Sequence, residues 1–388
     1  MKIGIILRVL WPAGAPRIAI EQVKRLSARG HNCKLIIYRE SDYKFRYEEF
    51  LNDIDVKFVT RGITSRISEI INSFTLPFLP SFRGKESIVD VTTIILYPLL
   101  ISKKSYDVIL CHDQFAGISG YLLKKIKGIP YVVYVHERPL CIGYSPKNAC
   151  VNKIKKWFNN IEKKVFENAD CVIASTDAIY EDLIKLFKIK ATILYPGCNP
   201  TVTPFLNRRN FVLALSRWDA PRNPYFLFDI AKKNKSLKFI IAGSWTPKSF
   251  EEEYRKNMNK QEIKNIEIRS NIPEKDLQEL YKTAAVSIRW GINEFGTSMS
   301  TLESISHGCP VIVNKELGGA RLITHGVDGF VVDGLDSDEY VKYIRLLLDK
   351  EDIAKEMRIN AWNLAKSLSW ENHVKRLDEI INNITKRR

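Results

Sequence analysis

The sequence predicts an α/β fold in which two Rossmann-like domains with parallel sheets face a central cleft. Strand-length apolar runs alternate with helical patterns along almost the whole chain, which is typical of parallel sheets. The alternation is interrupted at residues 196–204, which are rich in Pro, Gly and Asn and are expected to form a linker. A length of 388 residues suits two domains that each bury a core.

The first half opens with a strand-like run at residues 2–7, followed by a loop that contains Gly14. A helical pattern over residues 18–28 then ends at Gly30. The apolar run 88–101 is too short to span a bilayer, so we expect a buried or interfacial helix there. The other expected strands are 33–38, 107–111, 131–135, 171–174 and 192–195, with helices up to Lys127 and over 152–167.

After the linker the same alternation starts again. The expected strands are 211–215, 238–242, 266–268, 285–290, 311–313 and 329–332. The expected helices are 224–232, 274–284, 297–307, 337–348, 352–366 and 370–384.

The stretch 285–313 shows how this half would bind a ligand. An apolar strand leads through a turn bearing Glu294 into a helix that contains Glu303 and stops at Gly308. This order places a helix N-terminus, with its unpaired N–H groups, at the carboxyl end of a strand. Open α/β sheets bind anions there, so the sequence predicts an anion site bracketed by two acids.

Composition sets the class of protein. The chain is 45% hydrophobic and 27% charged, as ordinary soluble proteins are, and its formal charge of +16 suits phosphates, an anionic membrane or nucleic acid. Seven cysteines without a CxxC pair argue against a disulfide framework or a zinc site, although Cys141 and Cys150 could pair. Met1 leads directly into a strand, so we expect no secretory signal and a cytoplasmic location.

Several motifs together have counterparts in one family. In the second half these are LSRWDAPRNP, EFGTSMSTLESISHGCPVI and GGARLITHGVDGFVVD. In the first half they are DVILCHDQFAG, IPYVVYVHE and EKKVFENADCVIAST, and SWENHVKRLDEII closes the chain. With these motifs the chain resembles the retaining, nucleotide-sugar-dependent glycosyltransferases of family 4, which have the GT-B fold.

The resemblance implies two domains with different functions and a C-terminal helix that joins them. Residues 1–204 would form the acceptor-side domain and residues 205–369 the nucleotide-sugar-binding domain, while the helix 370–388 would pack back on the first. Two departures stand out. Eight residues separate Glu294 from Glu303 where the family has seven, and Arg222 replaces the family's usual lysine, exchanging a point charge for a planar fork.

For the donor, the resemblance implies that cations and helix amides stabilise the leaving diphosphate. Arg217 would fork two phosphate oxygens with help from Arg222, and Gly319 would let a backbone approach closely. The helix amides near Ser300, Thr301 and Leu302 would donate further hydrogen bonds. Glu303 would hold the ribose hydroxyls.

The remaining site residues are also assigned by resemblance. Glu294 would bind the sugar's hydroxyls or polarise the site. His112 and His136 end neighbouring strands of the first half, and one of them, by preference His112, would contact the donor sugar or its leaving group. The loop around Gly14 could admit acceptor and phosphate. No cofactor or metal is expected, because no DxD motif is flanked by apolar residues and cations can do the neutralising.

The basic segment 153–164 (KIKKWFNNIEKK), with Lys124, Lys125 and Lys127, has two interpretations. It could bind anionic lipids, or it could be a helix that packs its apolar stripe on the core and exposes its lysines. A membrane surface would suit a lipid-linked acceptor and a peripheral location on the cytoplasmic membrane face.

The resemblance therefore implies a retaining hexosyltransferase. It would move a hexose from a nucleotide diphosphate sugar to a hydroxyl of a glycan or lipid-linked acceptor. The alternatives are a sugar-nucleotide epimerase and a non-catalytic binding protein on the same fold. Nucleic acid is not an expected partner, because the charge is dispersed and no nucleic-acid module is recognisable.

Overall fold

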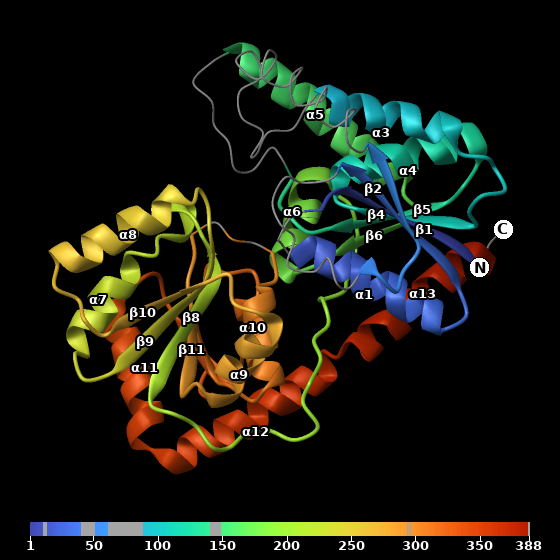
Figure 1. The fold of residues 1–388 in the computed structure, drawn as a ribbon. Helices are drawn as coiled ribbons and strands as arrows, with labels where there is room; N and C mark the ends of the chain where they lie inside the picture. The colour runs from blue at the N-terminus through green and yellow to red at the C-terminus, as the bar shows by residue number, and fades with distance from the viewer. Residues whose placement is uncertain are drawn as a thin grey trace. The chain divides into compact units, whose positions relative to one another are not determined.

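The computed structural model describes residues 1–10, 14–39, 51–60, 88–139, 149–292, 294 and 296–386, without the side chains of 60, 88–92 and 149–158. The chain divides into two compact units, Met1–Tyr195 with Glu371–Arg388 (unit 1) and Pro196–Trp370 (unit 2). Each unit is a parallel sheet with helices on both faces, so the expected pair of Rossmann-like α/β domains is confirmed (Figure 1).

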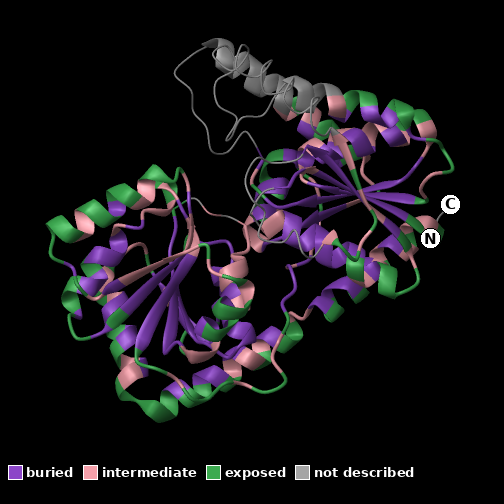
Figure 2. Ribbon diagram, viewed as in Figure 1, coloured by how far each residue is buried: buried purple, intermediate pink, exposed green. Residues whose placement is uncertain are grey.

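The sheet of unit 1 has the strand order β3-β2-β1-β4-β5-β6-β7, all parallel. Its central strands β1, β4 and β5 are apolar and almost wholly buried, as a sheet covered on both faces requires (Figure 2). The strands are β1 Lys2–Val9, β2 Asn32–Arg39, β3 Val56–Thr60, β4 Val108–His112, β5 Tyr131–Val135, β6 Cys171–Ala174 and β7 Thr192–Ile193.

The helices of unit 1 are α1 Gly14–Ala28, α3 Ile88–Leu100, α4 Gln114–Lys127, α5 Ala149–Asn168, α6 Asp177–Phe187 and α13 Trp370–Lys386. Helix α1 starts four residues before the predicted Ile18, because Pro16 falls in the first turn, where its missing N–H costs nothing. The C-terminal helix α13 lies beside α1 (Figure 1). Arg29, which follows α1, forms ion pairs with Glu371 and Asp378 of α13.

The sheet of unit 2 has the order β10-β9-β8-β11-β12-β13 and is also parallel. Its strands are β8 Phe211–Trp218, β9 Lys238–Trp245, β10 Ile266–Ser270, β11 Val286–Arg289, β12 Val311–Asn314 and β13 Gly329–Val332. Its helices are α7 Phe226–Lys233, α8 Ser249–Lys260, α9 Glu274–Thr283, α10 Met299–Ser306, α11 Ser337–Asp349 and α12 Glu351–Ser367, with short 3-10 turns at Ala220–Arg222 and Ala320–Leu322.

Within the described parts of the chain, no helix is long and apolar enough to cross a bilayer. Five cysteines of these parts, Cys33, Cys111, Cys171, Cys198 and Cys309, are free thiols. The possible pairing of Cys141 with Cys150 is not tested, because Cys141 lies outside the described residues and the side chain of Cys150 is not described either.

Candidate active site

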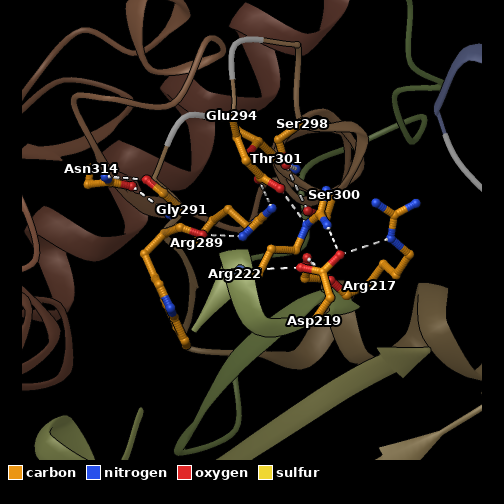
Figure 3. A network of polar contacts seen from close by, with 12 residues as sticks. Arg217, Asp219, Arg222, Arg289, Gly291, Glu294, Ser298, Ser300, Thr301 and Asn314 are labelled. Atoms are coloured by element: carbon orange, nitrogen blue, oxygen red, sulfur yellow. Dashed lines mark hydrogen bonds and ion pairs between the residues drawn. The ribbon is translucent and has the colours of Figure 1, made fainter. Parts of the chain in front are cut away.

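Two of the expected phosphate-binding residues, Arg217 and Arg222, meet at the carboxyl end of β8. Asp219 begins the 3-10 turn there, and its side chain accepts a hydrogen bond from the Arg222 amide. The same carboxylate pairs with Arg222 Nη1 at 2.5 Å and with Arg217 Nε at 3.4 Å (Figure 3). Asp219 therefore holds both cations at the sheet edge where parallel sheets bind ligands.

Glu294 lies between two arginines. Its carboxylate pairs with Arg222 Nε on one side and with Arg289 Nη2, at the end of β11, on the other (Figure 3). Arg289 is only 5% exposed, and burial lowers the pKa of its guanidinium while Glu294 opposes that shift. Three guanidinium groups and two carboxylates leave the cluster with one positive charge. The cluster therefore remains attractive to an anion.

The helix that follows this cluster is α10, which begins at Met299, two residues after the predicted start. Ser298 caps it, and the amides of Thr301 and Leu302 both donate to the Ser298 carbonyl, at 3.1 and 3.2 Å. Of the three predicted amide donors, Ser300 alone has no hydrogen bond to its N–H among the described residues. Leu302 is fully buried, so its side chain belongs to the core.

Glu303 lies within α10, and Gly319 packs against the start of this helix. The Glu303 carboxylate accepts a hydrogen bond from the Tyr281 hydroxyl of α9 at 2.9 Å, which fixes its direction. A Cβ added to Gly319 would lie 3.4 Å from the Ser298 nitrogen, and the neighbouring Gly318 amide donates to the Glu294 carbonyl at 2.8 Å. The glycine loop thus packs against both the Glu294 turn and the helix start.

Three residues that organise this site were not predicted from the sequence. Asp219 and Arg289 are the partners described above. Asn314, at the end of β12, exchanges two hydrogen bonds with the backbone of Gly291, at 3.0 and 2.9 Å, and so fixes the turn before Glu294 (Figure 3). Asp219 could have been found, because an aspartate three residues before Arg222 fits a helix N-cap. The other two have no local signal.

In unit 1, His112 ends β4 and His136 follows β5, as expected. His112 is fully buried, and both its ring nitrogens are bonded, Nδ1 to His136 Nε2 at 2.9 Å and Nε2 to Gln22 Oε1 at 2.8 Å. Burial lowers the pKa of both imidazoles, for His136 to about 3, so both are neutral at pH 7. A direct contact of His112 with a ligand would require one of these bonds to break. Gly14 is half-buried at the start of α1.

No group of three or more His, Cys, Asp or Glu side chains that could hold a metal occurs among the residues the structure describes. The expectation that no metal or cofactor is needed therefore stays a prediction.

Comparison with known proteins links the chain to one enzyme class. A family model described as Glycosyltransferase Family 4 matches residues 12–202, and one described as Glycosyl transferases group 1 matches residues 200–363. A UDP-Gal:alpha-D-GlcNAc-diphosphoundecaprenol alpha-1,3-galactosyltransferase of Escherichia coli is 25% identical over 344 residues, covering 82% of this chain and 84% of its own. A D-inositol 3-phosphate glycosyltransferase of Corynebacterium urealyticum is 24% identical over 307 residues, 71% of each chain.

Solved structures agree on the fold. The Anabaena protein HepE, crystallised with UDP-glucose, superposes with a TM-score of 0.74 at 16% identity over 99% of this chain and all of its own. WaaG, a glycosyltransferase involved in lipopolysaccharide biosynthesis, superposes with a TM-score of 0.69 at 15% identity over 98% of this chain and 99% of its own.

Proposed function

The chain belongs to the family 4 glycosyltransferases, which have the GT-B fold, and we propose that it is a retaining hexosyltransferase acting on a glycan or lipid-linked acceptor. Its donor is a nucleotide diphosphate sugar. The observation that supports this most directly is the arginine cluster of unit 2, where Arg217, Arg222 and Arg289 surround Asp219 and Glu294 next to the start of α10. Such a cluster suits a group that gains negative charge during the reaction.

In this reaction the residues of the site bind different groups of the donor. The bond from the anomeric carbon to the diphosphate oxygen breaks, and negative charge grows on the leaving diphosphate. Arg217 and Arg222, together with the Ser300 amide at the start of α10, bind that charge. Glu303 accepts hydrogen bonds from the ribose hydroxyls, and Gly319 lets the loop approach the donor. Glu294 accepts hydrogen bonds from the sugar.

The configuration of the anomeric carbon is retained if the acceptor attacks from the same face that the diphosphate leaves. The acceptor oxygen forms the new bond to the anomeric carbon, and its proton moves to the departing phosphate oxygen, so no separate protein base is required. No metal or cofactor takes part, because the guanidinium groups and the helix amides neutralise the diphosphate. In unit 1, Gly14 and the pair His112–His136 contribute to donor binding.

The relatives suggest which ligands to test first. The E. coli relative is named for UDP-galactose and a diphosphoundecaprenol-linked acceptor, and HepE was crystallised with UDP and UDP-glucose. We therefore propose a uridine nucleotide as the donor and a lipid-linked glycan as the acceptor of this chain.

The first expected result is a rise in thermal stability with one class of nucleotide. A ligand present at about a hundred times its dissociation constant adds roughly 2.7 kcal/mol to the free energy of unfolding. Thermal unfolding would be measured with UDP, GDP, ADP and their sugar conjugates, and we expect a rise with the uridine compounds. No rise with any nucleotide would contradict the proposal.

Measuring the products formed with and without an acceptor then distinguishes a transferase from an epimerase and from a binding protein. Transfer requires a saccharide acceptor such as a lipid-diphosphate-linked N-acetylglucosamine. Sugar conversion with the nucleotide still attached, and without acceptor, would indicate an epimerase. Nucleotide binding without any turnover would indicate a binding protein.

An enzyme that acts on a lipid-linked acceptor must reach the membrane surface, and helix α3 has an exposed apolar face that could bind there. Ile95, Leu96, Leu99 and Leu100 are 45%, 55%, 51% and 82% exposed, while Ile94 on the opposite side is buried. The spacing of the exposed residues places them on one helix face. Helix α3 packs against α4, whose last turn carries Lys124, Lys125 and Lys127 (Figure 1). An exposed apolar face on a helix that packs against this lysine-bearing helix suits an anionic membrane surface, and we propose peripheral binding there.

The basic segment 153–164 adds less to this proposal. The side chains of residues 153–158 lie outside the described part of the chain. Further along α5, Ile161 packs on the core of unit 1, and Lys163 pairs with Glu167 at 3.6 Å. The described turns of α5 therefore fit a helix that packs on the core. The exposed face of α3 is the better candidate for membrane binding.

Replacing Leu96, Leu99 and Leu100 together by serine is expected to weaken binding to anionic vesicles at least tenfold. Each substitution removes apolar surface that would be buried in the membrane, and such burial contributes roughly 25 cal/mol per Å² to binding. Co-sedimentation with phosphatidylglycerol vesicles measures the effect. The matched control replaces the exposed Ile353 and Ile359 of α12 by serine, which should leave binding unchanged. Equal binding by the α3 variant and the wild type would exclude this surface.

A further inference from the structure

A chain of four hydrogen bonds crosses the interior of unit 1 and ends at His136. His136 Nε2 meets His112 Nδ1 at 2.9 Å, and His112 Nε2 meets Gln22 Oε1 at 2.8 Å. Gln22 Nε2 meets His373 Nε2 at 2.9 Å, and His373 Nδ1 meets the Tyr195 carbonyl oxygen at 2.7 Å. The chain joins the ends of β5 and β4 to α1 and α13. None of its four side chains is more than 9% exposed.

The direction of every bond follows from the Tyr195 end. A carbonyl oxygen can only accept, so His373 donates through Nδ1. Burial lowers the pKa of His373 to about 4, so the ring is neutral at pH 7 and its Nε2 accepts from the Gln22 amide. The Gln22 oxygen must then accept from His112 Nε2. His112 Nδ1 in turn accepts from His136 Nε2, since a neutral imidazole has one donor and one acceptor.

The Nδ1 atom of His136 is left as a hydrogen-bond acceptor. No described residue donates to it, and His136 lies just beyond the carboxyl end of β5, where open α/β sheets bind ligands. A neutral Nδ1 lone pair can bind a hydroxyl but not a phosphate oxygen, because ionised phosphate has no hydrogen to donate. The direction of the chain therefore decides which chemical group His136 can recognise.

We propose that Gln22 and His373 are positioning residues that hold His136 in its Nε2–H tautomer, so that Nδ1 accepts a hydrogen bond from a substrate hydroxyl. The proposal rests on the proposed transfer from a sugar donor, which supplies the hydroxyl. It also gives the C-terminal helix α13 a part in substrate recognition, because His373 sets the direction from the far end. If the chain ran the other way, Nδ1 would carry a hydrogen and would favour an anion.

Histidine tautomers can be read directly by long-range proton–nitrogen correlation NMR of the full chain with labelled histidine. We expect His112 and His136 as the Nε2–H form and His373 as the Nδ1–H form, among six histidines in all. Gln22→Leu should leave His112 and His136 as tautomer mixtures. Gln22→Glu is the matched control for the His112 end of the chain, because its carboxyl oxygen still accepts from His112 Nε2 and should keep His112 and His136 in the Nε2–H form. His136 as the Nδ1–H form in the wild type would overturn the proposal.

A double-mutant cycle separates positioning from a purely structural role. Gln22→Leu should lower kcat/KM about tenfold, the size expected for a lost neutral hydrogen bond, and Gln22→Glu should restore it. In a His136→Phe background, Gln22→Leu should have no further effect. An equal loss in both backgrounds would overturn the proposal. Gln22→Met replaces Gln22→Leu if the leucine variant does not fold. If the wild type shows no transfer with any donor, the proposed function fails, while the NMR result still decides the tautomer.

Discussion

Arg217→Ala is expected to lower kcat/KM for sugar transfer at least a hundredfold. Removing one preorganised hydrogen-bond donor to a developing anion lowers kcat by a factor of about 100 to 1,000 in other enzymes. Arg217 lies at the end of β8, where its Nε pairs with Asp219 (Figure 3). The free energy of unfolding should change by less than about 1 kcal/mol, because the Arg217 side chain is 35% exposed and partly exposed ion pairs contribute little. Steady-state transfer and denaturant unfolding measure the two quantities.

Two further variants test the interpretation. Arg217→Lys keeps the charge but loses the planar fork, so its activity should lie between those of the wild type and the alanine variant. Arg222→Ala should lose as much activity but also stability, because Arg222 pairs with both Asp219 and Glu294. Wild-type turnover by Arg217→Ala would show that the diphosphate is bound elsewhere.

The sequence could predict most of the fold because buried parallel strands are continuous apolar runs separated by helical patterns. Helix α8 was missed for the same reason, since Tyr254 is its one buried residue among those the structure describes and no apolar stripe marks it. Helix α6 was also missed, although Thr176 caps it and its buried residues have helical spacing. The sequence of α6 therefore does carry a helical pattern.

The site was predictable where a short motif defines it, as for Arg217, Arg222 and Glu303. It was not predictable where distant residues meet. Arg289 lies within the apolar run 285–290, and nothing local shows that its charge is buried against Glu294. Gln22 and His373 are 351 positions apart in the sequence, so their contact depends on the return of α13 to unit 1. Pairings of this kind need the structure.

Glu294→Ala is expected to lower the free energy of unfolding by about 3 kcal/mol, because removing one partner of a buried ion pair leaves the other uncompensated. Arg222 keeps Asp219 as a partner, but Arg289, 5% exposed, loses the only carboxylate that pairs with it among the described residues. Transfer activity should fall as well. Denaturant unfolding and steady-state transfer would again be measured, and unchanged stability would show that Arg289 is not held by this pair.

A second substitution shows whether Glu294 also acts on the substrate. Arg289→Met in the Glu294→Ala background removes the unpaired charge, and we expect it to recover most of the lost stability, since apolar side chains often replace buried ion pairs without cost. If Glu294 binds the sugar, the double variant stays inactive although it is stable. If Glu294 serves only to neutralise Arg289, activity returns together with stability. Because Arg289 and Glu294 are side chains of one short segment, this cycle separates the electrostatic support of the site from its contact with the donor.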